Sequence, residues 1–278
     1  MGKAASEPIL VRIREALEAA TETALSFVHG AFDSSQKSLG RGPLTEADRA
    51  VNRVLRKALL RDGEGWLSEE SADDFDRIGK SHLWIVDPID GTREFVAGIP
   101  EWSISIGWVE QGRAIAGGIC NPATHELVLG SLSTGVTYNG ERVRASKISG
   151  LRGAVVLASR NGVESGQWDC FHGANFTVRP LGSIAYKMAL VAAGLGDATW
   201  TLRPKNEWDV AAGVALIESA GGFVQDLDGS RFTFNHRSTL IPGLIAGGTE
   251  LRREITLFLK GNRPNTRGAQ HNGYAAPS

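Results

Sequence analysis

The chain has 278 residues, of which 42% are hydrophobic and 22% charged, and its 30 basic and 31 acidic side chains leave a formal net charge of −1. This composition is that of a globular protein with one large fold or two fused halves, and it excludes a disordered chain. Because the charges balance, no long-range field favours nucleic acid or an anionic membrane. We therefore expect neither as a partner, and expect any charged ligand to be held by a local site.

The first residues and the cysteines indicate a compartment. No uncharged apolar run reaches the roughly 18 residues of a membrane-spanning helix, and Glu7 and Arg12 lie where a signal peptide would need an apolar stretch. Gly2 fits an N-myristoylation pattern, but no second anchoring signal accompanies it. Cys120 and Cys170 cannot build a disulfide framework or a four-ligand zinc site, so we expect two buried thiols in a reducing compartment. We expect a cytoplasmic protein.

The first half of the chain mixes helix and strand patterns. Apolar residues at helical spacing predict a helix over 9–28, a glycine- and serine-rich stretch predicts a loop over 33–42, and Thr45 is expected to cap a helix over 46–60. Apolar runs then predict strands over 66–68 and 83–86, an antiparallel meander over 104–109, 114–119 and 126–129, and a hairpin at 137–140 before a strand over 142–145.

The second half continues this mixture. We predict strands over 154–158, 176–179, 198–202, 222–225 and 241–246 and helices over 183–193, 209–220 and 253–259. From Gly261 onward periodicity is lost, so we expect a disordered tail over 261–278. The predicted organisation is a layered α/β fold with an N-terminal half over 1–145 and a C-terminal half over 146–260.

The most informative stretch is Asp87-Pro88-Ile89-Asp90-Gly91-Thr92, which follows the apolar run Leu83-Trp84-Ile85-Val86. Two carboxylates three residues apart, with Pro88 fixing a turn between them, offer the oxygen ligands that Mg²⁺ prefers, and each can serve a different ion. The main-chain carbonyl of Ile89 is a further donor. Gly91 allows close backbone approach, and the free N–H groups of a short helical segment over 92–97 can bind phosphate. The stretch predicts a metal and phosphate site in the N-terminal half.

A plainer interpretation is that these acids cap a turn and a helix, each contributing about 1 kcal/mol. Other acids favour the metal site, because each lies at a strand end or a helix start: Glu69-Glu70, Asp48 and Asp209. In open α/β sheets, ligands bind beyond the carboxyl ends of strands, which is where such acids fall.

Four stretches carry a family resemblance in their order and spacing: Leu44-Thr45-Glu46-Ala47-Asp48, Ser68-Glu69-Glu70-Ser71, Trp84 through Thr92, and Glu207-Trp208-Asp209-Val210-Ala211-Ala212-Gly213. Together they resemble the inositol monophosphatase superfamily of Mg²⁺-dependent phosphatases, over residues from about 10 to 247. The resemblance implies a five-layered α-β-α-β-α sandwich, commonly a homodimer, that hydrolyses a small phosphorylated metabolite.

The resemblance also implies roles for individual residues. Metal ligands are matched by Glu69, Asp87, the carbonyl of Ile89, Asp90 and Asp209. Thr92 and Asp48 match the pair that orients and deprotonates the attacking water, and Glu70 matches a neighbouring acid that supports a ligand or a third ion. Gly91 and Thr92 match the backbone phosphate cradle, and Asp209 also faces the substrate. Metal ions would neutralise the phosphate and lower the pKa of water, so that an in-line attack needs no covalent enzyme intermediate.

Members of the superfamily hydrolyse inositol monophosphates, histidinol phosphate, fructose bisphosphate or 3'-phosphoadenosine 5'-phosphate. Three features resemble the bisphosphate nucleotidase branch: Glu94-Phe95, Glu101-Trp102-Ser103, and Gly182-Ser183 with Lys187. Leu202 stands where the inositol branch carries a glutamate, whereas Gly98-Ile99-Pro100 resembles the inositol and histidinol branches. These features favour 3'-phosphoadenosine 5'-phosphate, with inositol monophosphate or histidinol phosphate as the alternative.

Two further questions stay open at this level. Ser183 and Lys187 are candidates for substrate contact, although Lys187 could instead be a solvated lysine on an otherwise apolar helix. A protein of this fold could also be a catalytically silent relative that binds or regulates, because fold does not fix function. The presence of every acid that the resemblance requires favours an enzyme.

Overall fold

The computed structural model describes residues 3–30 and 43–262. The expectations for Gly2, for the loop over 33–42 and for the tail beyond residue 262 lie outside the described residues. Among the helices that are described, none is long and apolar enough to cross a membrane.

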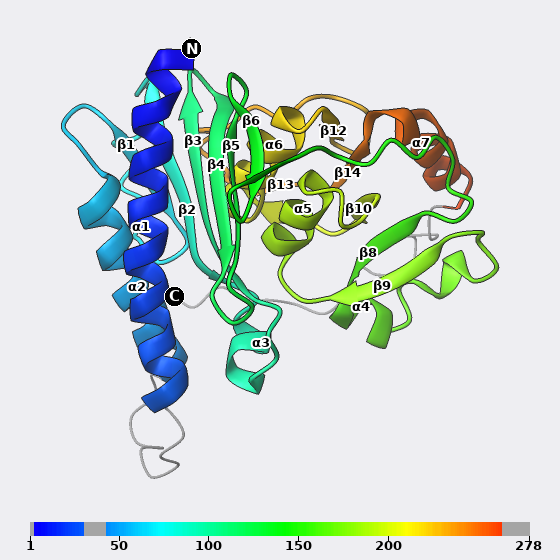
Figure 1. Ribbon diagram of the computed structural model, residues 1–278, viewed down its shortest axis with the longest axis horizontal. Coiled ribbons are helices and arrows are strands. Elements are labelled where there is room, and N and C mark those ends of the chain that lie inside the picture. The colour runs from blue at the N-terminus through cyan, green and yellow to red at the C-terminus, as the bar shows by residue number, and fades with distance from the viewer. Residues whose placement is uncertain (1–2, 31–42, 263–278) are drawn as a thin grey trace.

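A seven-stranded sheet forms the first layer of strands (Figure 1). Its strands lie side by side in chain order: β1 (Gly65–Ser68), β2 (His82–Asp90), β3 (Ser103–Glu110), β4 (Arg113–Asn121), β5 (Glu126–Ser131), β6 (Gly135–Tyr138) and β7 (Glu141–Val143). All neighbours are antiparallel except β1 and β2, which run parallel with Ser68 beside Val86. Because parallel strands end at the same edge, the residues that follow β1 lie beside the end of β2.

A five-stranded sheet forms the second layer of strands. Its order is β12 (Gly222–Gln225), β14 (Leu244–Gly248), β10 (Ala198–Thr201), β8 (Val155–Ser159) and β9 (Thr177–Leu181). β8 runs parallel to both β9 and β10, whereas β14 is antiparallel to β10 and β12. A short antiparallel pair, β11 (Lys205–Asn206) with β13 (Leu240–Ile241), lies outside both sheets.

The helices complete five layers (Figure 1). α1 (Lys3–Gly30) and α2 (Pro43–Leu59) cover one face of the seven-stranded sheet, and α5 (Ile184–Ala192) and α6 (Glu207–Ser219) lie between the two sheets. α7 (Arg252–Gly261), preceded by the 3₁₀ turn η2 (Thr249–Leu251), packs on the outer face of the five-stranded sheet. Three separate clusters of buried apolar side chains fill the spaces between these layers. The predicted α-β-α-β-α sandwich is confirmed.

Small residues allow α6 to lie directly on the seven-stranded sheet. A Cβ atom on Gly117 would lie 2.7 Å from the carbonyl oxygen of Ala212, and one on Gly107 would lie 3.0 Å from the Cβ of Ala211. Because interiors are close-packed, a larger side chain at either glycine would push the helix away. Asp209 belongs to the first turn of α6, so this contact sets its position against the sheet.

Several predicted element bounds differ from the structure. β2 continues to Asp90, so the acids expected in a turn belong to the strand itself. α2 begins at Pro43, before the expected cap Thr45, because proline suits the first turn of a helix. The strand predicted over 241–246 is two strands, interrupted at Gly243, whose φ of 149° is open to glycine. The short helices α3 (Thr92–Ala97), α4 (Arg160–Glu164) and η1 (Asp169–Phe171) complete the fold, and the last two were not predicted.

The two cysteines differ in their surroundings. Cys120 is buried, as expected, and burial raises the pKa of its thiol to about 11. Cys170 is exposed, so the expectation of a second buried thiol is wrong. Cys170 belongs to η1, where its neighbours Trp168 and Phe171 pack inward against Trp200 and leave the cysteine at the surface.

Candidate active site

Asp87 and Asp90 reach the same side of the sheet because β2 is irregular between them. In a regular strand, residues three apart point to opposite faces. The pairing of β2 with β3 shifts between Asp87, opposite Ser105, and Asp90, opposite Ser103. Pro88 falls inside this shift and has no N–H group to give to a ladder. The irregularity thus brings the two carboxylates to one side of the sheet, which the predicted turn was expected to do.

Asp209 joins this pair from α6. One carboxylate oxygen each from Asp87, Asp90 and Asp209 lie within 4.8 Å of one another, a spacing that lets three acids share a cation. Asp87 is almost fully buried, and its Oδ1 has no hydrogen-bond partner among the described residues. A buried carboxylate oxygen without a partner is costly, and an oxygen-preferring cation such as Mg²⁺ would satisfy it. The donor set fits a hard divalent metal.

Hydrogen bonds hold the other oxygens of this group in place. Oδ2 of Asp90 accepts the hydroxyl of Ser183 and the backbone N–H of Ala185, each at 2.6 Å, at the start of α5. Oδ2 of Asp209 accepts the backbone N–H of Asn206 at 2.7 Å, at the start of α6. Each aspartate is therefore fixed through one oxygen at a helix N-terminus, which favours its negative charge. Ser183, predicted as a substrate contact, is placed here as a partner of Asp90.

The remaining predicted acids surround this group. Glu69 follows β1 and lies close enough to Asp209 and Asp90 to interact with them electrostatically, although its side chain is open to solvent. Asp48 is buried on α2 and interacts with Glu70 and Glu69. The structure thus brings together all six predicted acids, with Asp87, Asp90 and Asp209 forming the tightest group.

Burial, and then mutual repulsion, raises the pKa values of these carboxyls. Burial, followed by repulsion from Glu70 and Glu69, raises the pKa of Asp48 to about 7. Burial, followed by repulsion from Asp90, raises the pKa of Asp209 to about 6. Burial and repulsion from Asp90 also raise the pKa of Asp87 well above its ordinary value. Such shifts are expected at a cation site built from several acids, because each ionised carboxylate makes ionisation of its neighbours less favourable.

Gly91 and Thr92 lead from β2 into α3. Gly91 adopts φ 92°, and a Cβ atom there would lie 3.1 Å from the carbonyl oxygen of Glu101. Only glycine suits both the left-handed backbone and the close contact. The hydroxyl of Thr92 donates to the carbonyl of Ile89 at 3.4 Å, which keeps the threonine beside the acids. The predicted phosphate cradle therefore lies next to the predicted metal ligands.

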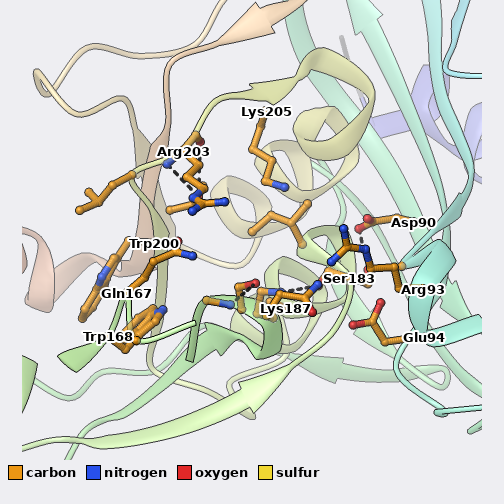
Figure 2. Close-up of a pocket in the computed structure, with 18 of the residues that line it drawn as sticks. Asp90, Arg93, Glu94, Gln167, Trp168, Ser183, Lys187, Trp200, Arg203 and Lys205 are labelled. Carbon is orange, nitrogen blue, oxygen red and sulfur yellow. Dashed lines mark hydrogen bonds between the residues drawn. The ribbon is translucent and has the colours of Figure 1, made fainter. Parts of the chain in front are cut away.

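A pocket of about 690 Å³ opens from this edge of the sheet (Figure 2). Asp90, Gly91 and Thr92 line one side, and Trp168 and Trp200, whose rings stack 5.2 Å apart, line another. Besides Lys187, three further basic residues line it: Arg93, Arg203 and Lys205. Sequence reasoning missed all three, although Arg203 and Lys205 immediately precede the Glu207-Trp208-Asp209 motif.

Lys187 is not a solvated lysine. It is only 4% exposed, and its ammonium donates to the carbonyl oxygens of Leu181, Gly182 and Ser183, at 3.3 Å and 2.9 Å for the first and last. Burial lowers its pKa to about 8. An ammonium has three N–H donors, so all of them are in use. A direct phosphate contact by Lys187 would require one of these bonds to break.

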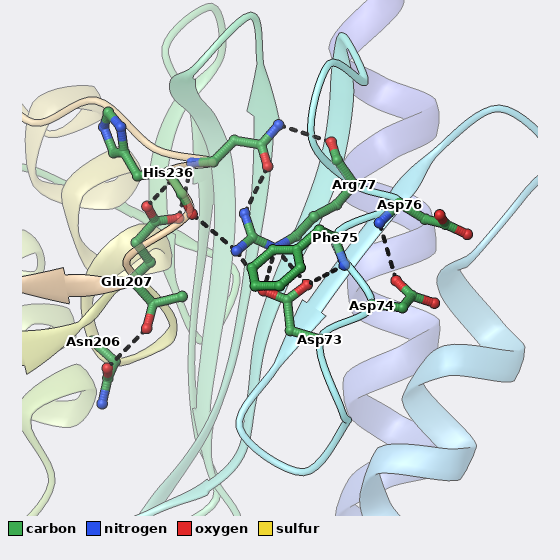
Figure 3. A network of polar contacts seen from close by, with 10 residues as sticks. Asp73, Asp74, Phe75, Asp76, Arg77, Asn206, Glu207 and His236 are labelled. Carbon is green, nitrogen blue, oxygen red and sulfur yellow. Dashed lines mark hydrogen bonds and ion pairs between the residues drawn. The ribbon is translucent and has the colours of Figure 1, made fainter.

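A second polar network holds the two flanks of the site together (Figure 3). Arg77, on the loop after Glu70, is 2% exposed and bonds Asp73 through Nε at 3.1 Å and through a terminal nitrogen at 2.6 Å. It also donates to the side chain of Asn235 and the carbonyl of His236, both at 2.9 Å. Glu207, at the start of α6, accepts the backbone N–H groups of Asn235 and His236. The loop beside the acids is thereby tied to the helix that carries Asp209.

Comparisons with known proteins agree with this architecture. A family model described as "Inositol monophosphatase family" matches residues 6–256. An inositol-1-monophosphatase of Mesorhizobium japonicum is 33% identical over 267 residues, which cover 90% of this chain and 95% of the relative. A Thermotoga maritima protein named fructose-1,6-bisphosphatase/inositol-1-monophosphatase is 34% identical over 212 residues, or 74% of this chain and 80% of the relative. The solved structure of an inositol monophosphatase from Anabaena (Nostoc) superposes with a TM-score of 0.76 at 25% identity and covers 94% of this chain and 98% of that one.

Proposed function

The chain belongs to the inositol monophosphatase family, a family of metal-dependent phosphatases, and we propose that it hydrolyses a small phosphomonoester with Mg²⁺ as its metal. The observation that carries the proposal is the convergence of Asp87, Asp90 and Asp209, together with the buried Oδ1 of Asp87, which has no hydrogen-bond partner in the part of the chain that the structure describes. Asp87, Asp90, Asp209, Glu69 and the carbonyl of Ile89 would hold the metal ions. When bound, Mg²⁺ neutralises phosphate charge and lowers the pKa of water.

The remaining residues of the site bind phosphate and accept a proton. The backbone N–H groups of Gly91 and Thr92 orient the phosphate beside the acids. The hydroxyl of Thr92 uses its hydrogen for Ile89 and keeps its lone pairs to accept a bond from the attacking water. Asp48, whose pKa is about 7 without metal, takes up the proton, and Glu70 beside it adds negative charge. Attack in line with the leaving oxygen then needs no covalent intermediate.

For the substrate we propose a doubly phosphorylated nucleotide such as 3'-phosphoadenosine 5'-phosphate. Leu202 lines the pocket at the position where inositol-binding relatives carry a glutamate, and it cannot pair with an inositol hydroxyl. The pocket volume of about 690 Å³ and the wall containing Trp168 also suit a ligand larger than a single sugar ring. Glu94, part of the Glu94-Phe95 pair that resembles the bisphosphate nucleotidase branch, is buried and lines the same pocket.

Inositol monophosphate is the alternative substrate. The names of the relatives from Mesorhizobium japonicum and Thermotoga maritima favour it. We also propose that the protein is a homodimer, as the family resemblance implies, and light scattering coupled to gel filtration tests this.

A phosphate-release assay tests the proposed activity. The panel contains 3'-phosphoadenosine 5'-phosphate, inositol 1-phosphate, fructose 1,6-bisphosphate and histidinol phosphate, each with Mg²⁺, with excess chelator, and after Mg²⁺ is restored. We expect release that requires Mg²⁺ and is greatest for the nucleotide. Asp87→Asn serves as the matched control, since it removes one charge without changing size. Undiminished activity in chelator would contradict the metal assignment, and greatest activity on inositol 1-phosphate would establish the alternative substrate.

A further inference from the structure

More basic side chains line the pocket than are needed to bind a single phosphate beside the acids. Arg93, Arg203 and Lys205 line it together with Lys187. Among the described residues, no hydrogen bond or ion pair engages the side-chain nitrogens of Arg93, Arg203 or Lys205. The ammonium of Lys187, in contrast, already has three carbonyl acceptors. The basic groups available to a ligand are therefore the first three.

These three residues lie on two sides of the pocket (Figure 2). Arg93 stands beside Asp90, on the side of the acids, whereas Arg203 and Lys205 extend from the opposite chain segment with their basic tips toward the pocket. A phosphate held at Gly91 and Thr92 would lie on the side of Arg93. A second anionic group of the same substrate would then meet Arg203 and Lys205.

The backbone over 203–205, which carries Arg203 and Lys205, is restrained. Lys205 belongs to β11, which pairs with β13 through Ile241, and its side chain is half-buried. The backbone N–H of Arg203 donates to the hydroxyl of Thr201 at 3.2 Å. Pro204 between them has a fixed φ and restricts the residue before it. Because this backbone is already ordered, binding an anion has to order only the two side chains.

Lys205 also lies close to the reaction centre. It precedes Asp209 by four residues, at the start of the segment that leads into α6, and it lines the same pocket as Asp90. A group bound to Lys205 is therefore within the reach of a small substrate whose other phosphate lies at the acids. Arginine adds planar donors that match phosphate, and lysine adds a compact charge.

We propose that Arg203 and Lys205 form a subsite for a second anionic group of the substrate, so that this protein prefers doubly anionic phosphomonoesters. The proposal rests on the phosphatase function proposed above and specifies the substrate class. It assigns recognition of the second group to the segment before α6, and it leaves Lys187 as a residue that fixes the turn between β9 and α5.

The test compares substrates that differ only by the second phosphate. Adenosine 3',5'-bisphosphate is compared with adenosine 3'-phosphate, and fructose 1,6-bisphosphate with fructose 1-phosphate, in the wild type, Lys205→Met, Arg203→Met and the matched control Lys260→Met on the exposed face of α7. We expect the wild type to prefer the bisphosphate in at least one pair. In Lys205→Met and in Arg203→Met, the loss of one charge-assisted hydrogen bond should lower kcat/KM for that bisphosphate about tenfold to hundredfold. The monophosphate should change less than about threefold, and Lys260→Met should change neither.

Two results would overturn the subsite. One is the absence of a bisphosphate preference in both pairs. The other is an equal loss for monophosphate and bisphosphate in Lys205→Met, which would mean that the lysine does not recognise the second phosphate. Lys205→Arg, which keeps the charge, should retain most of the preference and shows that the fold is intact.

A binding measurement separates this proposal from the proposed function. Calorimetric titration with adenosine 3',5'-bisphosphate and with fructose 1,6-bisphosphate, in excess chelator, requires no turnover. If no compound releases phosphate but one bisphosphate binds, and both methionine variants weaken that binding about tenfold or more, the phosphatase function fails and the subsite stands. If turnover occurs and the variants leave both binding and substrate preference unchanged, the function stands and the subsite fails.

Discussion

Metal binding at neutral pH should release protons, and the number can be worked out from the site. At pH 7 a carboxyl with a pKa of about 7 is half protonated, and one with a pKa of about 6 is about one-tenth protonated. Burial and repulsion from Asp209 raise the pKa of Glu69 to about 7, so Asp48 and Glu69 belong to the first kind and Asp209 to the second. Burial and repulsion from Asp90 raise the pKa of Asp87 as well. Because Mg²⁺ binds ionised carboxylates and its positive charge also favours ionisation of the neighbouring Asp48, we expect about one proton to leave per binding event.

The dependence on pH follows with a definite sign. Below pH 7 more of these carboxyls are protonated, so release rises and the apparent affinity for Mg²⁺ falls. By pH 9 the groups with pKa values of about 6 and 7 are ionised before the metal binds, and their contribution vanishes. For each proton released, the apparent dissociation constant should fall about tenfold per pH unit of increase.

Isothermal titration calorimetry measures this directly. Titrations of Mg²⁺ into the chelator-treated protein are repeated in buffers with different ionisation enthalpies, and the slope of observed enthalpy against buffer enthalpy gives the number of protons. Asp48→Asn should lower the slope at pH 7 by about half a proton. The exposed Asp62→Asn is the control and should leave it unchanged. A slope of zero at pH 7 in the wild type would refute the argument, because the acids would then be ionised already and could not be crowded as described.

Four further outcomes follow from the same structure. The raised pKa of Asp48 contributes stability below about pH 4, and this stability is lost as the pH rises through about 7. Asp48→Asn should therefore raise the melting temperature of the chelated protein at pH 8 and leave it unchanged at pH 4. Equal effects at the two pH values would contradict this. Asp90→Asn should lower kcat by orders of magnitude with an unchanged circular dichroism spectrum, and near wild-type turnover would remove Asp90 from the metal ligands. Thr92→Ala should lower kcat by about 10²- to 10⁴-fold while calorimetric Mg²⁺ affinity is kept; weakened Mg²⁺ binding would make its role structural. Arg77→Met should lower the free energy of unfolding in urea by about 3–5 kcal/mol, whereas Lys80→Met, at an exposed position of the same loop, should lower it by less than about 0.5 kcal/mol. Equal losses in the two variants would show that the Arg77 network does not stabilise the fold.

Local pattern was enough to predict much of the fold. Helices α1 and α5 and the meander of β3, β4 and β5 were found because their apolar residues repeat with the period of the element and end at glycine or proline. The stretch from Asp87 to Thr92 indicated a metal and phosphate site, but its spacing alone also allowed acids that only cap a turn and a helix. Local pattern did not predict the ends of some elements correctly. It missed that β2 continues to Asp90, because an irregular strand contains the same residue types as a turn.

The resemblance to a family supplied the more distant members of the site. Nothing in the spacing of Asp48 or Asp209 required them to meet Asp87, and only matching motifs suggested it. The convergence depends on contacts between layers, above all on the glycines of β3 and β4 that let α6 lie against the sheet. Such contacts join residues far apart in the chain, where sequence periodicity carries no information.

The sequence by itself determined the layered α/β class, the order of most elements and the acids available to bind a metal. The tertiary structure alone decided how side chains are used. Lys187 follows the pattern of a surface lysine, yet it is buried because three carbonyls meet its ammonium. Arg203 and Lys205 carried no motif, yet both line the pocket, and no side chain or backbone group in residues 3–30 and 43–262 bonds their side-chain nitrogens. Burial and hydrogen-bond partners come from neighbours distant in sequence, and these two quantities decide whether a charge stabilises the fold or remains available for a ligand.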